Sequence, residues 1–79
     1  DEPVSVAQRA NKPSLRAEAL QRFGAFHSFA GDQLKAVDYY DRALEYSRRA
    51  LKINPNMDGV RRNIELLERL LEQRRRQMI

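Results

Sequence analysis

The sequence predicts an all-α protein, a three-helix antiparallel bundle with almost no loop. Apolar residues recur at helical spacing in three segments, and no segment alternates polar and apolar residues as a strand does. Gly31-Asp32 and Asn54-Pro55-Asn56 interrupt this pattern where a helical chain would turn. Between these two turns, AVDYYDR, ALEYSRR and ALKINPN each begin with alanine at seven-residue spacing. Small residues on one helical face let a neighbouring backbone approach closely, so this segment is expected to pack against other helices.

Residues 1–12 are predicted to form an extended or partly helical leader, followed by a single helical domain at residues 13–79. Pro3 lies in this leader, Pro13 follows it, and its apolar pattern is thin. A short helical turn over residues 4–10 is left open.

The first full helix is expected at about residues 14–30. Proline suits the first turn of a helix, so Pro13 or Ser14 marks its start. Gly31 can adopt the left-handed conformation that closes a helix, and Asp32 can cap the next one, which predicts a tight hairpin. A wide apolar arc is expected along this helix, formed by Leu15, Leu20, Phe23, Phe26, His27 and Ala30.

The second helix is expected at about residues 33–54, unbroken through Arg48. Asn54-Pro55-Asn56 stops it, because proline disfavours helix in the preceding residue and cannot donate the next hydrogen bond. The third helix is expected at about residues 57–76 as a cap over the hairpin, fraying toward residue 79. Its apolar stripe consists of Val60, Ile64, Leu66, Leu67, Leu70 and Leu71.

Composition describes one small soluble domain: 79 residues, 42% hydrophobic and 33% charged. No apolar run approaches the roughly 18 residues of a membrane span. The chain begins at Asp1 without a methionine or signal-like segment, which indicates a fragment or processed product, and localisation is left open. The net charge of +4 comes from arginine, and five acid–arginine pairs four residues apart favour solvated helix surfaces over a nucleic-acid patch. These pairs are Glu18–Arg22, Asp38–Arg42, Glu45–Arg49, Glu65–Arg69 and Glu72–Arg76.

No residue pattern indicates catalysis, so the sequence predicts neither an enzyme nor a cofactor or metal site. His27, the only histidine, is expected to be a packed ring, and there is no cysteine or cluster of carboxylates to hold a metal. The serines lack a recognisable base, and the three single glycines form no phosphate loop. The run Arg74-Arg75-Arg76 is explained by the favourable position of cations at a helix C-terminus.

The spacing resembles the tetratricopeptide repeat, a helix-turn-helix unit of about 34 residues. Matching positions are Leu20, Phe23-Gly24, His27, Gly31-Asp32, Ala36, Tyr40 and Ala43-Leu44. The family's proline would fall at Arg48, but one further heptad precedes Pro55 here. Read from its other end, the segment fits the pattern again, with Ala43, Ala50-Leu51 and Pro55-Asn56, before Val60 and Asn63-Ile64 open a following repeat. The resemblance covers residues 17–71, about one and a half repeats.

A second family is also similar, the microtubule-interacting and trafficking domains, which are three-helix bundles with a longer second helix. The residues that suit this family are Ala30-Gly31, Ala36, Tyr40, Ala43 and Tyr46. The repeat family is preferred because of Phe23-Gly24, Asn54-Pro55-Asn56 and Asn63-Ile64.

The repeat resemblance implies a protein-interaction module, a scaffold or adaptor that binds a partner segment between its first and third helices. Carried over by position, the groove would be lined by Gln21, Ala25, Ser28, Phe29, Arg62, Leu66, Arg69 and Leu70. Apolar anchors beside two guanidinium groups predict an acidic or amphipathic segment as the partner. The family's clamp for chaperone tails would need lysine and asparagine where Gln21 and Ala25 stand, so such tails are not expected.

Tyr39 and Tyr46 mark a possible second surface, because they repeat at seven-residue spacing. They would form an apolar ridge for a partner helix unless the leader or the third helix covers them, and burial within the chain is the preferred interpretation. A homodimer that covers Leu66, Leu70 and Met78-Ile79 is a further alternative. Nucleic acid is the least favoured partner.

Overall fold

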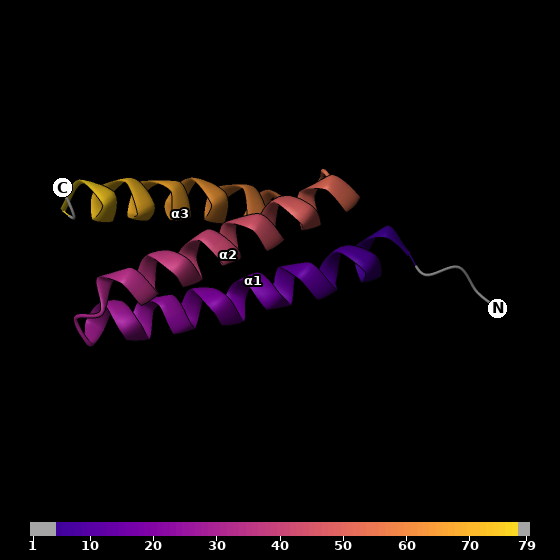
Figure 1. The fold of residues 1–79 in the computed structure, drawn as a ribbon. Helices are drawn as coiled ribbons and strands as arrows, with labels where there is room; N and C mark the ends of the chain where they lie inside the picture. Colours follow the sequence, from indigo (N-terminus) through magenta and orange to yellow (C-terminus); the bar gives the residue numbers. More distant parts are fainter. Residues whose placement is uncertain (1–4, 78–79) are drawn as a thin grey trace.

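Three α-helices in antiparallel order form the part of the chain that the computed structural model describes, residues 5–77 (Figure 1). α1 spans Val6–Phe29, α2 spans Gln33–Ile53 and α3 spans Asp58–Gln77. The predicted all-α, three-helix class is confirmed, and α2 and α3 begin and end within one residue of the prediction. α2 also runs unbroken through Arg48, as its surplus heptad predicts. No described helix is long and apolar enough to cross a membrane.

The beginning of α1 differs from the prediction, because the helix starts at Val6 and not at Pro13 or Ser14. Ser5 is the N-cap: its hydroxyl accepts a hydrogen bond from the Gln8 amide at 3.1 Å, and the Gln8 side chain accepts one from the Ser5 amide at 3.2 Å. This capping box satisfies two free amides of the first turn. The predicted leader is therefore helical from Val6 onward, while its residues 1–4 lie outside the described part.

Ser5→Ala should consequently fray the first turns of α1 by removing about 1 kcal/mol of local stability. Amide hydrogen exchange should become faster over residues 8–11 and remain unchanged in α2 and α3. Ser14→Ala is the matched control, because Ser14 lies inside α1 and caps nothing. Equal acceleration in both variants would show that Ser5 does not start the helix.

The α1–α2 hairpin turns over three residues, as predicted. Gly31 has a φ of 86°, in the left-handed region that favours glycine. The side chain of Asp32 accepts a hydrogen bond from the Lys35 amide at 3.1 Å and so caps α2. Because the turn is this short, it fixes the register in which α1 and α2 pack.

Small residues occupy the interface between α1 and α2 on both helices. α2 contributes the alanines of its three heptads, and α1 contributes its own set at the same seven-residue spacing. These six buried residues are Ala10, Ala17 and Gly24 on α1 and Ala36, Ala43 and Ala50 on α2. Two antiparallel helices that face each other through small residues can approach closely along their whole length.

The register of this interface shows what the surplus heptad of α2 packs against. Gly24 faces the ring of Tyr40, and the Arg16 guanidinium reaches the Tyr46 hydroxyl at 3.2 Å. Continued along the antiparallel pair, this register places Ala10 level with the last turns of α2. The first turns of α1 therefore cover the surplus heptad of α2, the third of its units, which begins at Ala50.

α3 is attached to α2 through a small core and two ion pairs. Leu67 and Leu71 are its buried residues, and they cluster with apolar side chains of α2 that include Tyr40 and Leu44. Between the two helices, Arg75 binds both carboxylate oxygens of Asp41 at 2.8 and 2.9 Å, and Arg48 lies 3.7 Å from Glu68. Of the five predicted acid–arginine pairs, all but Glu18–Arg22 lie within 4.0 Å.

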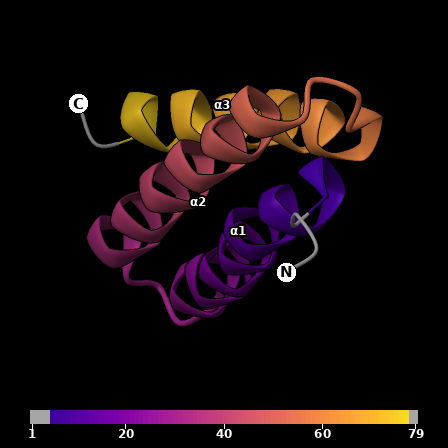
Figure 2. The ribbon, with the colours of Figure 1, turned by 90° about the vertical axis from the view of Figure 1, so that its right-hand side faces the viewer.

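The molecule is elongated, with α2 between its two neighbours. Its radius of gyration is 13.8 Å and its longest extent 51 Å, whereas a compact domain of this length would have a radius of about 12 Å. α2 packs against both α1 and α3, but α1 and α3 barely contact each other. Figure 2 shows the beginning of α1 near the beginning of α3, and in Figure 1 the two helices diverge toward the end of α3. Much of the surface of α1 is consequently left open.

Candidate protein-interaction surfaces

A groove lies between α1 and α3, with α2 as its floor. Its cavity measures about 310 Å³, and Ser47 of α2, which is 1% exposed, lies among the lining residues. The other lining residues are Ser14, Ala17, Glu18 and Gln21 from α1 and Gly59, Val60 and Asn63 from α3. Five of the eight lining residues are polar: Ser14, Glu18, Gln21, Ser47 and Asn63.

Of the eight residues predicted to line such a groove, Gln21 lies in this cavity. Ser28 and Leu70 are half-buried, and Leu70 packs against the core of α2 and α3. The other five are exposed: Ala25 and Phe29 on α1, and Arg62, Leu66 and Arg69 on α3. Phe29, at 97% exposure, makes almost no contact with the rest of the chain. The structure thus places the predicted residues on both helices without bringing them together in one cavity.

Arg74 spans the wider end of the space between α1 and α3. Its guanidinium lies 5.0 Å from the centroid of the Tyr40 ring, donates a hydrogen bond to the Ser28 hydroxyl, and donates another to the Leu70 carbonyl at 3.4 Å. The explanation of Arg74-Arg75-Arg76 by helix-end electrostatics alone is therefore too simple. Arg74 bridges three helices, Arg75 binds Asp41, and Arg76 pairs with Glu72 of its own helix.

The two tyrosines of the predicted second surface are half-buried, and side chains of α1 contact both. Tyr39 stacks with Phe23 and with His27, at centroid distances of 5.6 and 5.2 Å. Tyr46 has the guanidinium groups of Arg16 and Arg49 over its ring, at 5.6 and 4.9 Å from the centroid. The sequence favours burial of these tyrosines within the chain, under the leader or the third helix. The residues that cover them instead belong to α1 and to α2 itself. His27 is a packed ring, as expected.

A third surface, an exposed side of α1 that reaches α2 at one edge, was not predicted as a site. We call it the outer face of α1. Three large residues of the predicted apolar arc are exposed there: Leu15 at 64%, Phe23 at 54% and Phe26 at 64%. Part of the arc expected to be core therefore faces solvent, while Leu20 packs against the core and His27 is half-buried. The outer face consists of Leu15, Ala19, Arg22, Phe23 and Phe26.

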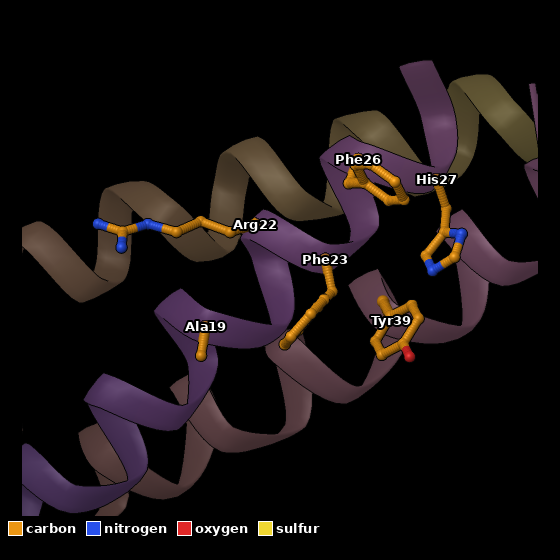
Figure 3. A pocket seen from close by; sticks show the side chains of 6 residues that line it. All are labelled: Ala19, Arg22, Phe23, Phe26, His27 and Tyr39. Atoms are coloured by element: carbon orange, nitrogen blue, oxygen red, sulfur yellow. The ribbon is translucent and has the colours of Figure 1, made fainter. Parts of the chain in front are cut away.

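An open pocket of about 590 Å³ indents this face. α1 supplies Ala19, Arg22, Phe23, Phe26 and His27 to its lining, and α2 supplies Tyr39. Figure 3 shows the rings of Phe23, His27 and Tyr39 gathered where the two helices meet, while the side chain of Arg22 points away from them. The pocket is lined mainly by aromatic rings, with Arg22 at its border.

The sequence indicates this outer face only when the small and the large apolar residues of α1 are considered separately. Ala10, Ala17 and Gly24 recur every seven residues and identify the face of α1 that packs against α2. Leu15 and Phe26 lie roughly opposite that face of the helix. Treating the small and the large apolar residues as separate sets would have shown that α1 is apolar on two sides.

Comparison with protein-family models, with curated proteins and with solved structures finds no match to this chain. Within residues 5–77, no three histidine, cysteine or acidic side chains come together in a group that could hold a metal ion. The three surfaces are accordingly interpreted from their own chemistry.

Proposed function

We propose that the protein is a helical interaction module of the tetratricopeptide type, a scaffold or adaptor that binds an acidic or amphipathic segment of another protein along α1 and α3. The observation that carries this proposal is the open arrangement, in which α1 and α3 flank α2 but barely contact each other. A segment laid between them would contact both helices at once.

The exposed residues of the two helices support such a partner. Phe29 and Leu66, at 97% and 44% exposure, are available as apolar anchors. Arg62 and Arg69 are exposed on the same helix as Leu66, and within residues 5–77 the one ion pair of Arg69 is a long 4.0 Å contact with Glu65. Exposed guanidinium groups beside apolar anchors favour carboxylate-bearing segments.

Reversing the charge at Arg62→Glu together with Arg69→Glu should weaken binding of acidic peptides by at least about tenfold, since each charged contact contributes on the order of 1 kcal/mol. Isothermal titration calorimetry with an acidic peptide library measures the effect. Arg42→Glu with Arg49→Glu, on α2, is a control that changes the net charge equally. Equal weakening of binding in the control would show that the effect arises from net charge alone. Unchanged affinity in the α3 variant would contradict the groove proposal.

The trafficking-domain alternative draws support from the unbroken α2, whose 21 residues exceed the second helix of a single repeat unit. In that case, binding would depend on α2 and α3 and would be unaffected by Phe29→Ala. Titration of Phe29→Ala with the same peptides therefore separates the two alternatives, because the groove proposal uses Phe29 as an anchor. Homodimer formation is a further alternative; of its predicted contacts, Leu66 is exposed and Leu70 half-buried, while Met78-Ile79 lies outside the described residues.

A further inference from the structure

Four of the six residues that line the pocket on the outer face of α1 have the spacing of a coiled-coil hole. Ala19, Arg22, Phe23 and Phe26 occupy positions i, i+3, i+4 and i+7 of one helix. In knobs-into-holes packing, four residues at this spacing receive one apolar side chain of a partner helix. Because the side chain of Ala19 is small, it leaves room for the partner side chain. The two phenylalanines form the walls, and both are more than half exposed.

The outer face is also long enough for several turns of a helix. From Leu15 to Phe26 it extends about 17 Å along α1, at 1.5 Å per residue. Its apolar residues recur at intervals of four, four and three, as they do on a helix surface that packs against another helix. A partner helix that places one side chain in the pocket can therefore also contact Leu15.

The charges of α1 indicate which kind of helix would fit. α1 contains four cations, Arg9, Lys12, Arg16 and Arg22, and one carboxylate, Glu18, which lines the groove toward α3. No ion pair within residues 5–77 involves any of these four cations, whereas seven ion pairs form elsewhere in that range. Arg16 is engaged with Tyr46 of α2, but Arg22 lies on the outer face and Lys12 lies three residues before Leu15, and neither has a carboxylate partner in the described part of the chain.

We propose that the outer face of α1 binds an acidic amphipathic helix of another protein. A large apolar side chain of that helix occupies the pocket, and its flanking carboxylates pair with Arg22 and Lys12. A second copy of this chain fits less well, because α1 has four cations and one carboxylate, so two copies of α1 would bring like charges together. This site is separate from the proposed groove, which lies on the α3 side of α1.

Two designed peptides test the proposal on the full chain. Each has 21 residues, with leucine at heptad positions a and d; one has glutamate and the other lysine at positions e and g. The glutamate peptide should bind and shift the amide resonances of residues 15–26, while the lysine peptide should bind at least about tenfold more weakly. Equal binding of the two peptides, or shifts confined to α3, would overturn the proposal.

Variants then locate the site without disturbing the fold, because the residues involved are exposed. Phe26→Ala should weaken binding of the glutamate peptide by at least about tenfold. Arg22→Glu should reverse the preference, so that the lysine peptide binds more tightly than the glutamate peptide. Arg62→Glu with Arg69→Glu is the control: it removes any binding of the peptide in the proposed groove, while the shifts of the amide resonances of residues 15–26 should remain. Loss of these shifts in the control would contradict the proposal. Concentration-dependent dimerisation of the wild type that Phe26→Ala abolishes would also contradict it.

Discussion

Leu67→Ala should release α3 from the hairpin while α1 and α2 remain paired. Leu67 is 0% exposed and is one of two buried residues that attach α3 to α2. A leucine-to-alanine change at such a site costs about 2–5 kcal/mol. A domain of this length has about 4–12 kcal/mol of stability in total. The loss is thus a large part of the total stability of the domain, and it mainly affects α3.

Hydrogen exchange and thermal melting measure this effect. Amides of α3 should lose their protection first, and the melting temperature should fall by at least about 10 °C. Leu66→Ala is the matched control, since the same chemical change at the neighbouring position removes a side chain that is already 44% exposed. It should cost clearly less than Leu67→Ala, because a smaller part of its apolar surface is buried. Similar losses in the two variants would mean that α3 is not held by the side of the helix that carries Leu67.

Gly24→Ala should destabilise the protein, although alanine favours helix over glycine by about 1 kcal/mol. A Cβ at Gly24 would lie 2.9 Å from two ring carbons of Tyr40, closer than carbon atoms approach without displacement. The ring has little freedom to move, because Tyr40 is 3% exposed and carries the Arg74 guanidinium over its face. Overpacking of this kind costs about 1–3 kcal/mol, so after the gain in helix propensity a net loss of up to about 2 kcal/mol is expected.

Gly59→Ala provides the control for helix propensity. Gly59 also lies in a helix, but a Cβ there would meet nothing within 4 Å. This variant should be neutral or more stable by up to about 1 kcal/mol in urea unfolding. Combining Gly24→Ala with Tyr40→Leu should recover part of the loss, since the ring that the new methyl group meets is gone. Stabilisation by Gly24→Ala alone would show that α1 and α2 are not in close contact at this position.

The predictable parts of the fold were those controlled by local chemistry. Gly31, Asp32 and Pro55 act through their own backbone and side chains, so the hairpin turn and the end of α2 followed from the sequence. The beginning of α1 did not, because Pro13 resembles a first-turn proline and Ala10 gives a weak apolar signal. Only the structure shows that Ala10 is fully buried, within a helix that starts at the Ser5 capping box.

The candidate surfaces were predictable to a smaller extent, because exposure depends on which helices pack together. The sequence indicates that Phe23, Phe26 and Leu20 share one broad side of α1, but not that α2 covers only the edge of that side nearest Leu20. Likewise, the position of Arg74 depends on how far α1 and α3 diverge. These features follow from tertiary packing, which residue spacing alone does not determine.

Because the small residues of α1 and α2 recur at the same seven-residue spacing, the two helices of the hairpin must change length together. Each step of seven residues adds two turns, about 10 Å, to both helices and one small residue to each side of the interface. An insertion in one helix alone would leave an apolar turn without a partner, whereas equal insertions in both would keep every contact. Such a hairpin can lengthen or shorten during evolution only by coordinated changes on the two sides of Gly31.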